Sequence, residues 1–334
     1  MRVYRTTFMR SLRHRWPRIK KVLPWVVLAV VAVLLFYFGR SVDWPKVWQA
    51  MRSIPGESIL MASGLVVLGY LSYGALDLLG RRYTGHKLGW PSVMGIAMLS
   101  YALNLSLGVL VGGLGARLRL YARLGCRKSV ATRVAVFSAA SNWIGYAWVA
   151  GVVFVSGALK VPQGWDVGNG VLRLIGAGLL AAGIAYVWMC ARANRRSATL
   201  MGQRVTLPRA RMALLQVLFA GLSWMFMGAV AYVLLQGKAS YPLVMGILLC
   251  ASFAAVLTRV PGGLGTTEAI FVAVLAPRMP YSEALGAALA YRACYALAPM
   301  CLALAAFPLF EARAAWRKRH APAQQEHNLL HPPS

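Results

Sequence analysis

Eight runs of predominantly apolar residues make this chain an integral membrane protein. The runs lie near residues 22–38, 59–79, 91–111, 130–157, 172–190, 212–235, 241–259 and 282–309. Several of them reach the length of about 17–25 apolar residues that a bilayer-spanning helix requires. Hydrophobic residues make up 59% of the 334 residues, which is too many for a soluble domain of this length. We therefore expect an all-α polytopic membrane protein.

A repeated tetrapeptide predicts that the chain contains an internal duplication. Gly-Gly-Leu-Gly occurs at Gly112–Gly115 and again 150 residues later at Gly262–Gly265, each time after an apolar run. The same shift lays the other apolar runs of one half on those of the other. We predict two membrane repeats, residues 22–157 and 158–310, between a basic tail at 1–21 and a basic and polar tail at 311–334. The alternative is coincidence, because glycine and leucine are abundant here.

The charge distribution separates a membrane protein from a nucleic-acid binder. The chain has 36 Lys and Arg residues against eight acidic ones, a net charge of +28. Most of the basic residues gather beside apolar runs, in clusters at 2–21, 81–87, 117–133, 192–211 and 313–319. Clusters in such positions follow the positive-inside rule and attract anionic lipid headgroups. We expect anionic phospholipids as partners and no nucleic acid.

The same clusters predict the topology. If all eight runs crossed the membrane, the clusters at 117–133 and 192–211 would lie outside the cell, against the positive-inside rule. The conflict disappears if the two runs that precede the glycine motifs are re-entrant hairpins. The prediction is then six full transmembrane helices, two re-entrant hairpins that enter from opposite sides as inverted repeats, and two cytoplasmic termini. Ordinary loops with glycine caps are the alternative.

Glycine suits a turn at membrane depth because it permits unusual backbone angles and close packing. Proline at the second motif would stop a helix there. The residues that we expect to shape the two turns are Gly112, Gly113 and Gly115 in the first copy and Pro261, Gly262, Gly263 and Gly265 in the second.

Ionisable residues within apolar segments are the candidate site, since they are costly in a bilayer unless they are paired or functional. Asp77 lies near the end of the second run, where an ion pair with Arg81, one turn later, is the structural alternative. Glu268 follows the second glycine motif, where a helix N-terminus would also favour a carboxylate. Arg292 lies inside the last run and needs an acidic partner, for which Glu268 and Glu283 are the nearest candidates in sequence.

Arginines beside the glycine motifs fit a phosphate-bearing headgroup. Arg117 follows the first motif and Arg259 precedes the second. Arginine binds phosphate through two parallel hydrogen bonds, which lysine cannot reproduce. The predicted substrate-binding residues are therefore Arg117, Arg259, Glu268, Asp77 and Arg292.

Cysteine and histidine give no sign of a disulfide framework or a metal centre. Four of the five cysteines lie inside apolar runs, and the five histidines lie only in tails or in one loop. We expect no metal site, no cofactor and no catalytic residue.

Three features together resemble the bacterial flippase-like family that includes the membrane region of lysylphosphatidylglycerol synthases. They are Pro261 to Glu268, Gly112 to Arg117, and the acidic Asp77, within a resemblance that covers roughly residues 20–315. The resemblance implies transfer of a lipid between leaflets, with Asp77, Arg117 and Glu268 as the family-like polar positions. It does not imply synthesis, because the chain ends soon after Arg319 without the soluble synthase domain.

The leading hypothesis is a lipid translocase of the bacterial inner membrane rather than an enzyme. The alternatives are a membrane enzyme that acts on lipid-linked substrates and a non-catalytic scaffold for lipid-synthesis enzymes. Such enzymes would be partners of a scaffold, and a homodimer is a further expectation.

Overall fold

The computed structural model describes residues 43–159, 168–193, 197–200, 203–258 and 260–306, with 308 and 312. The predicted basic tail at 1–21, the first apolar run at 22–38, all but one residue of the tail at 311–334, and Arg259 lie outside these ranges. The chain divides into two compact units, Met1–Lys46 and Val47–Ser334. Everything below concerns the second unit.

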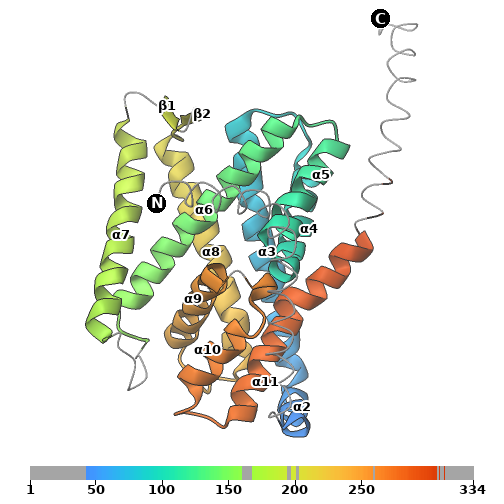
Figure 1. Cartoon of the computed structure of the whole chain (residues 1–334), viewed down its shortest axis with the longest axis vertical. Helices are drawn as coiled ribbons and strands as arrows, with labels where there is room; N and C mark the ends of the chain where they lie inside the picture. Colours follow the sequence, from blue (N-terminus) through green and yellow to red (C-terminus); the bar gives the residue numbers. More distant parts are fainter. Residues whose placement is uncertain are drawn as a thin grey trace, which may run out of the picture. The chain divides into compact units, whose positions relative to one another are not determined.

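The described residues are almost entirely helical, which confirms the all-α prediction (Figure 1). The α-helices are α2 (Trp44–Arg52), α3 (Gly56–Thr84), α4 (Trp90–Leu107), α5 (Ala116–Arg123), α6 (Lys128–Val155), α7 (Asn169–Arg192), α8 (Ala210–Leu234), α9 (Tyr241–Thr258), α10 (Thr266–Leu275) and α11 (Tyr281–Arg292). Two π-helices, η1 (Val109–Gly115) and η3 (Ala293–Leu297), and the 3₁₀ turn η2 (Pro261–Gly263) continue or join them. A two-stranded antiparallel hairpin of β1 (Ser197–Leu200) and β2 (Gln203–Thr206) lies in the connection before α8.

Six described helical segments are long and apolar enough to cross a membrane. Five of them, α3, α6, α7, α8 and the segment Tyr281–Ala306, match predicted full crossings. The sixth is α9, which the sequence assigns to the second glycine hairpin. Proline and glycine mark several ends: Pro55 and Pro280 precede α3 and α11, and Gly85 ends α3 with a left-handed backbone, φ 70°.

The order of elements repeats along the chain as the duplication predicts. The series α3, α4, η1, α5, α6 recurs as α8, α9, η2, α10, α11, with the glycine motif at the same place in each. The two equivalent helices α3 and α8 pack against each other more extensively than any other pair, and they run in opposite directions (Figure 1). Opposite directions of equivalent helices are what the predicted inverted repeats require.

Small residues allow the long helices to approach closely, as in other membrane bundles. A Cβ atom added to Gly145 in α6 would come within 2.3 Å of the Ala220 side chain in α8. One added to Gly176 in α7 would come within 2.8 Å of Phe154 in α6. Close contact of this kind holds α6 against α7 and α8.

Candidate functional site

The chain reverses at Gly108, where α4 ends with φ 84°, and the first glycine motif lies in the π-helix η1 that follows. After α4 ends, η1 folds back along it so closely that a Cβ atom on Gly112 would stand 2.1 Å from the Leu103 carbonyl oxygen. A Cβ atom on Gly113 would stand 2.7 Å from Asn104 Oδ1. Gly112 faces backbone atoms, so only glycine fits there, whereas at Gly113 the Asn104 side chain would have to move. The chain then returns through α5 beside α4.

The second motif also reverses the chain, between α9 and α10. Gly262, Gly263 and Gly265 all have positive φ angles, of 63°, 59° and 77°. Such angles favour glycine because side chains of L-residues clash with the backbone there. The second motif is therefore a turn between helices, whereas the first lies in η1 just after the turn. That the two hairpins are re-entrant stays a prediction.

The tips of the two hairpins meet. An added Cβ atom on Gly262 would lie 2.8 Å from the carbonyl oxygen of Ser106, at the end of α4. The Ser106 hydroxyl in turn donates to the carbonyl oxygen of Ala296 in η3, at 3.5 Å. Turns that lie 150 residues apart in sequence thus share one contact region.

Arg292 binds the second turn from α11. Its Nε donates to Glu268 Oε1 at 2.5 Å and its Nη2 to Glu268 Oε2 at 3.0 Å, which is a two-pronged ion pair. Its remaining donors reach the carbonyl oxygens of Gly262 at 2.8 Å and Gly263 at 3.0 Å. One guanidinium therefore neutralises the carboxylate and fixes the backbone of the glycine turn. Glu268 is the partner, whereas Glu283 pairs elsewhere.

Asp77 and Arg117 form a second ion pair, at the first hairpin, and this one is buried. Arg117 Nη2, in α5, lies 3.4 Å from Asp77 Oδ1, in α3, and the two side chains are 6% and 0% exposed. Ser138 donates to Asp77 Oδ1 at 2.6 Å and Tyr121 donates to Oδ2 at 3.4 Å. The structure does not show the alternative pair with Arg81, because α5 brings a closer guanidinium to the buried carboxylate.

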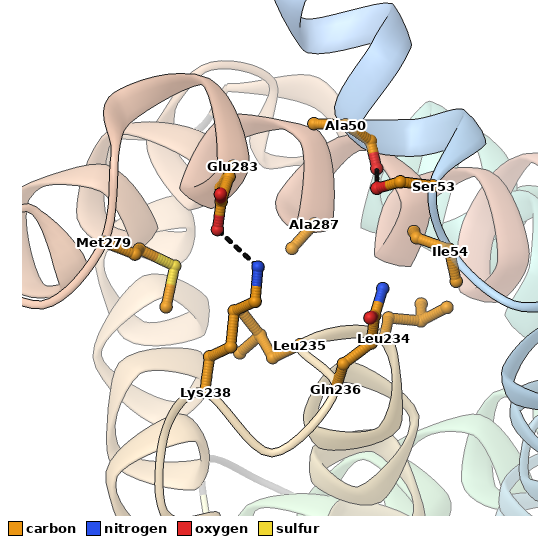
Figure 2. A pocket seen from close by; sticks show the side chains of 10 residues that line it. All are labelled: Ala50, Ser53, Ile54, Leu234, Leu235, Gln236, Lys238, Met279, Glu283 and Ala287. Carbon is orange, nitrogen blue, oxygen red and sulfur yellow. Dashed lines mark hydrogen bonds and ion pairs between the residues drawn. The ribbon is translucent and has the colours of Figure 1, made fainter.

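Glu283 belongs to a different, exposed pair at the N-terminal end of α11. Its carboxylate accepts a hydrogen bond from Lys238 Nζ at 2.5 Å, and the side chains are 37% and 49% exposed. Figure 2 shows the two groups pointing toward each other across a cavity of about 30 Å³. This pair has the same charges as the Glu268 pair and a solvated setting, so it is a natural control.

Comparison with known proteins identifies the chain. Residues 25–303 match the protein family described as the lysylphosphatidylglycerol synthase TM region. The chain belongs to this family. The resemblance inferred from the glycine motifs and Asp77 is thereby confirmed.

Two relatives match this chain over nearly their whole lengths. Inner membrane protein YbhN of Escherichia coli (strain K12) is 42% identical over 307 residues, which cover 92% of this chain and 96% of YbhN. The protein slr0712 of Synechocystis is 29% identical over 320 residues, which cover 91% and 97%.

A cluster of tyrosines links the two ion pairs of this family member. The Tyr73 ring stacks on Tyr101 at 3.7 Å, and Arg117 lies 5.9 Å from the centre of the Tyr73 ring. The Tyr101 and Tyr295 hydroxyls lie 3.5 Å apart, and Tyr295 stacks on Tyr291, the neighbour of Arg292. Sequence reasoning missed these residues, although Tyr291 and Tyr295 lie one helical turn apart within an apolar run.

In this family member, Glu268 and Arg292 therefore pair at one hairpin, and Asp77 and Arg117 pair at the other. Each hairpin is joined to a long helix of its own half by one ion pair. The carboxylate lies in the long helix in the first half and in the hairpin in the second. Within the described ranges, no group of three or more potential metal ligands occurs.

Proposed function

We propose that this chain is a lipid translocase that moves an anionic phospholipid, or a modified one, between membrane leaflets. The observation that carries the proposal is the set of hydrogen bonds made by Arg292. Its guanidinium binds Glu268 and two glycine carbonyl oxygens where the two hairpins meet. A lipid phosphate offers the same two-pronged acceptor as a carboxylate. A headgroup that competes for Arg292 would release the turn.

Inverted halves suit such a cycle, because each hairpin can be exposed to one side of the membrane in turn. We propose that the glycine hairpins are re-entrant and that the chain carries out no covalent chemistry. We propose, from the basic clusters in the sequence, that both termini lie in the cytoplasm. The name of the Escherichia coli relative supports an inner-membrane location for this chain. Binding to lipid-synthesis enzymes and homodimer formation stay predictions.

The experiment is leaflet exchange of fluorescent phosphatidylglycerol, cardiolipin and aminoacylated lipid in proteoliposomes. Glu268→Gln keeps the size of the side chain and removes its charge, so the pair with Arg292 is weakened at the turn. We expect exchange to fall to the rate of protein-free vesicles. Glu283→Gln, in the exposed pair with Lys238, is the matched control and should exchange lipid at the wild-type rate.

Other outcomes would overturn the proposal. Wild-type exchange by a folded Glu268→Gln variant would remove this carboxylate from the mechanism. A covalently changed lipid would favour the membrane-enzyme alternative. Absence of exchange for every lipid, together with co-purification of a lipid-synthesis enzyme, would favour a scaffold.

A further inference from the structure

A second charged feature lies apart from the hairpin tips, at the C-terminal end of α3. Arg81 and Arg82 line a cleft of about 420 Å³ between α3, α4 and α8. Its apolar walls are Ala75, Leu78, Leu79 and Phe219, and Trp90 lies beside the arginines. We call this the α3–α4–α8 cleft. Clefts of this size are typical of small-ligand sites.

The two arginines of the cleft differ from those of the hairpins because no carboxylate neutralises them. Within the part of the chain that the structure describes, no acidic side chain lies within ion-pair distance of Arg81 or Arg82. The Nε atom of Arg81 is buried and has no hydrogen-bond partner. A buried charged donor without an acceptor is costly. An anion in the cleft would neutralise the charge of these two guanidinium groups.

The shape of the cleft requires a ligand with one anionic and one apolar end. Ala75, Leu78 and Arg82 are spaced three, four and seven residues apart, which places them on one face of α3. A ligand along this face would meet apolar side chains first and a guanidinium last. Phe219 forms the wall contributed by α8. Trp90 is 63% exposed beside the arginines, as tryptophans at the headgroup level of a bilayer are.

We propose that the α3–α4–α8 cleft binds one anionic phospholipid, with its phosphodiester on Arg81 and Arg82 and the first part of an acyl chain against Phe219. Arg117 and Arg292 are already bound to carboxylates, so the first contact with a headgroup falls to arginines without acidic partners. This inference rests on the proposed function, for which the cleft is the site of substrate uptake. Binding and exchange are therefore measured separately.

The test is photo-crosslinking by the full chain in nanodiscs that contain equal amounts of phosphatidylglycerol and phosphatidylcholine. Benzoylphenylalanine replaces Phe219, which preserves an aromatic ring in the cleft. The control probe replaces Phe253, an exposed residue of α9. Mass spectrometry then quantifies the captured lipid. We expect the probe at position 219 to capture phosphatidylglycerol selectively. The probe at position 253 should capture both lipids equally.

Arginine variants connect the selectivity to the cleft. Arg81→Gln with Arg82→Gln should lower phosphatidylglycerol capture at Phe219 about tenfold, as loss of charge-assisted hydrogen bonds does. Arg82 is exposed, so the protein should tolerate its substitution. Arg82→Gln alone should lower phosphatidylglycerol capture less than the double variant does. Lys128→Gln, at an exposed residue outside the cleft, should leave it unchanged.

Three results would overturn the inference: equal capture of both lipids at Phe219, capture that is unchanged in the arginine variants, or inhibition by inorganic phosphate, which would make free phosphate the ligand. Leaflet exchange on the same preparations separates the two proposals. Selective capture without exchange would support the cleft and refute translocation. Exchange without selective capture would support translocation and refute the cleft.

Discussion

At the scale of single residues, the buried Arg117 and the partly buried Arg292 are held in different ways. Arg292 donates to four acceptors, two of them carboxylate oxygens and two backbone carbonyls, so it couples charge to backbone geometry. Arg117 lies against Asp77 and the Tyr73 ring. The first arrangement can release a turn when its carboxylate is lost, whereas the second mainly holds α5 against α3.

Asp77→Asn should destabilise the fold, because it leaves Arg117 with an uncompensated charge in a buried place. Removal of one partner of a buried pair costs about 3–5 kcal/mol. Glu283→Gln, in the exposed pair, should cost no more than about 1 kcal/mol. Denaturant unfolding in detergent measures both changes. Equal stability of the two variants would contradict a structural role of the Asp77 pair.

The stability of the fold should depend on pH through His86, which lies in the loop after α3. Burial, and next the nearby Arg81 charge, lower the pKa of His86 from its usual value. The folded chain therefore binds fewer protons at this residue than the unfolded chain. Its contribution to stability is present at neutral pH and is lost as the pH falls through about 6.5. The unfolding temperature of wild type should fall more than that of His86→Gln between about pH 7.5 and about pH 5.

At the scale of elements, the glycine hairpins depend on close backbone contacts. A side chain at the glycine positions would prevent these contacts. The first turn requires it at Gly112, where η1 folds back on α4. The second requires it at Gly262, where the backbone of the turn touches the end of α4. Two π-helices, η1 and η3, lie at these contacts, and such irregular turns often mark functional sites.

Gly112→Ala should separate η1 from α4, since its Cβ atom would stand 2.1 Å from the Leu103 carbonyl oxygen. We expect a loss of stability of about 3 kcal/mol or more, at the upper end of overpacking costs. Gly64→Ala is the control, because an added Cβ atom there meets nothing within 4 Å. That change should leave stability within about 1 kcal/mol of wild type. Similar unfolding temperatures for the two variants would refute the close approach.

At the scale of the whole molecule, the inverted halves explain why the basic connections gather at one end of the bundle. The end of α3, the end of α5 and the end of α7 lie at the same end of the bundle in Figure 1, and the clusters at 81–87, 117–133 and 192–211 begin or lie there in the sequence. The C-terminal ends of α6 and α8 lie at the other end. In this view each glycine hairpin begins and ends at the same end of the bundle. That the hairpins are re-entrant in a membrane stays a prediction.

Single cysteines on a cysteine-free background test this arrangement in intact cells. Lys128→Cys, in the basic connections, should react with a membrane-impermeant reagent only after the membrane is opened. Lys238→Cys, after α8, should react from outside. External labelling of Lys128→Cys would contradict the proposed orientation of the chain.

The sequence by itself determined that this is an all-α membrane protein and how its two repeats align. It also determined that Arg292 needs an acidic partner. Apolar length, charge asymmetry and the spacing of the glycine motifs are local properties, so they can be read without coordinates. The partner of Asp77, the tyrosine cluster and the cleft at Arg81 were decided only by the tertiary structure. They join helices far apart along the chain, and no local pattern specifies which face of α3 meets α5, α4 or α8.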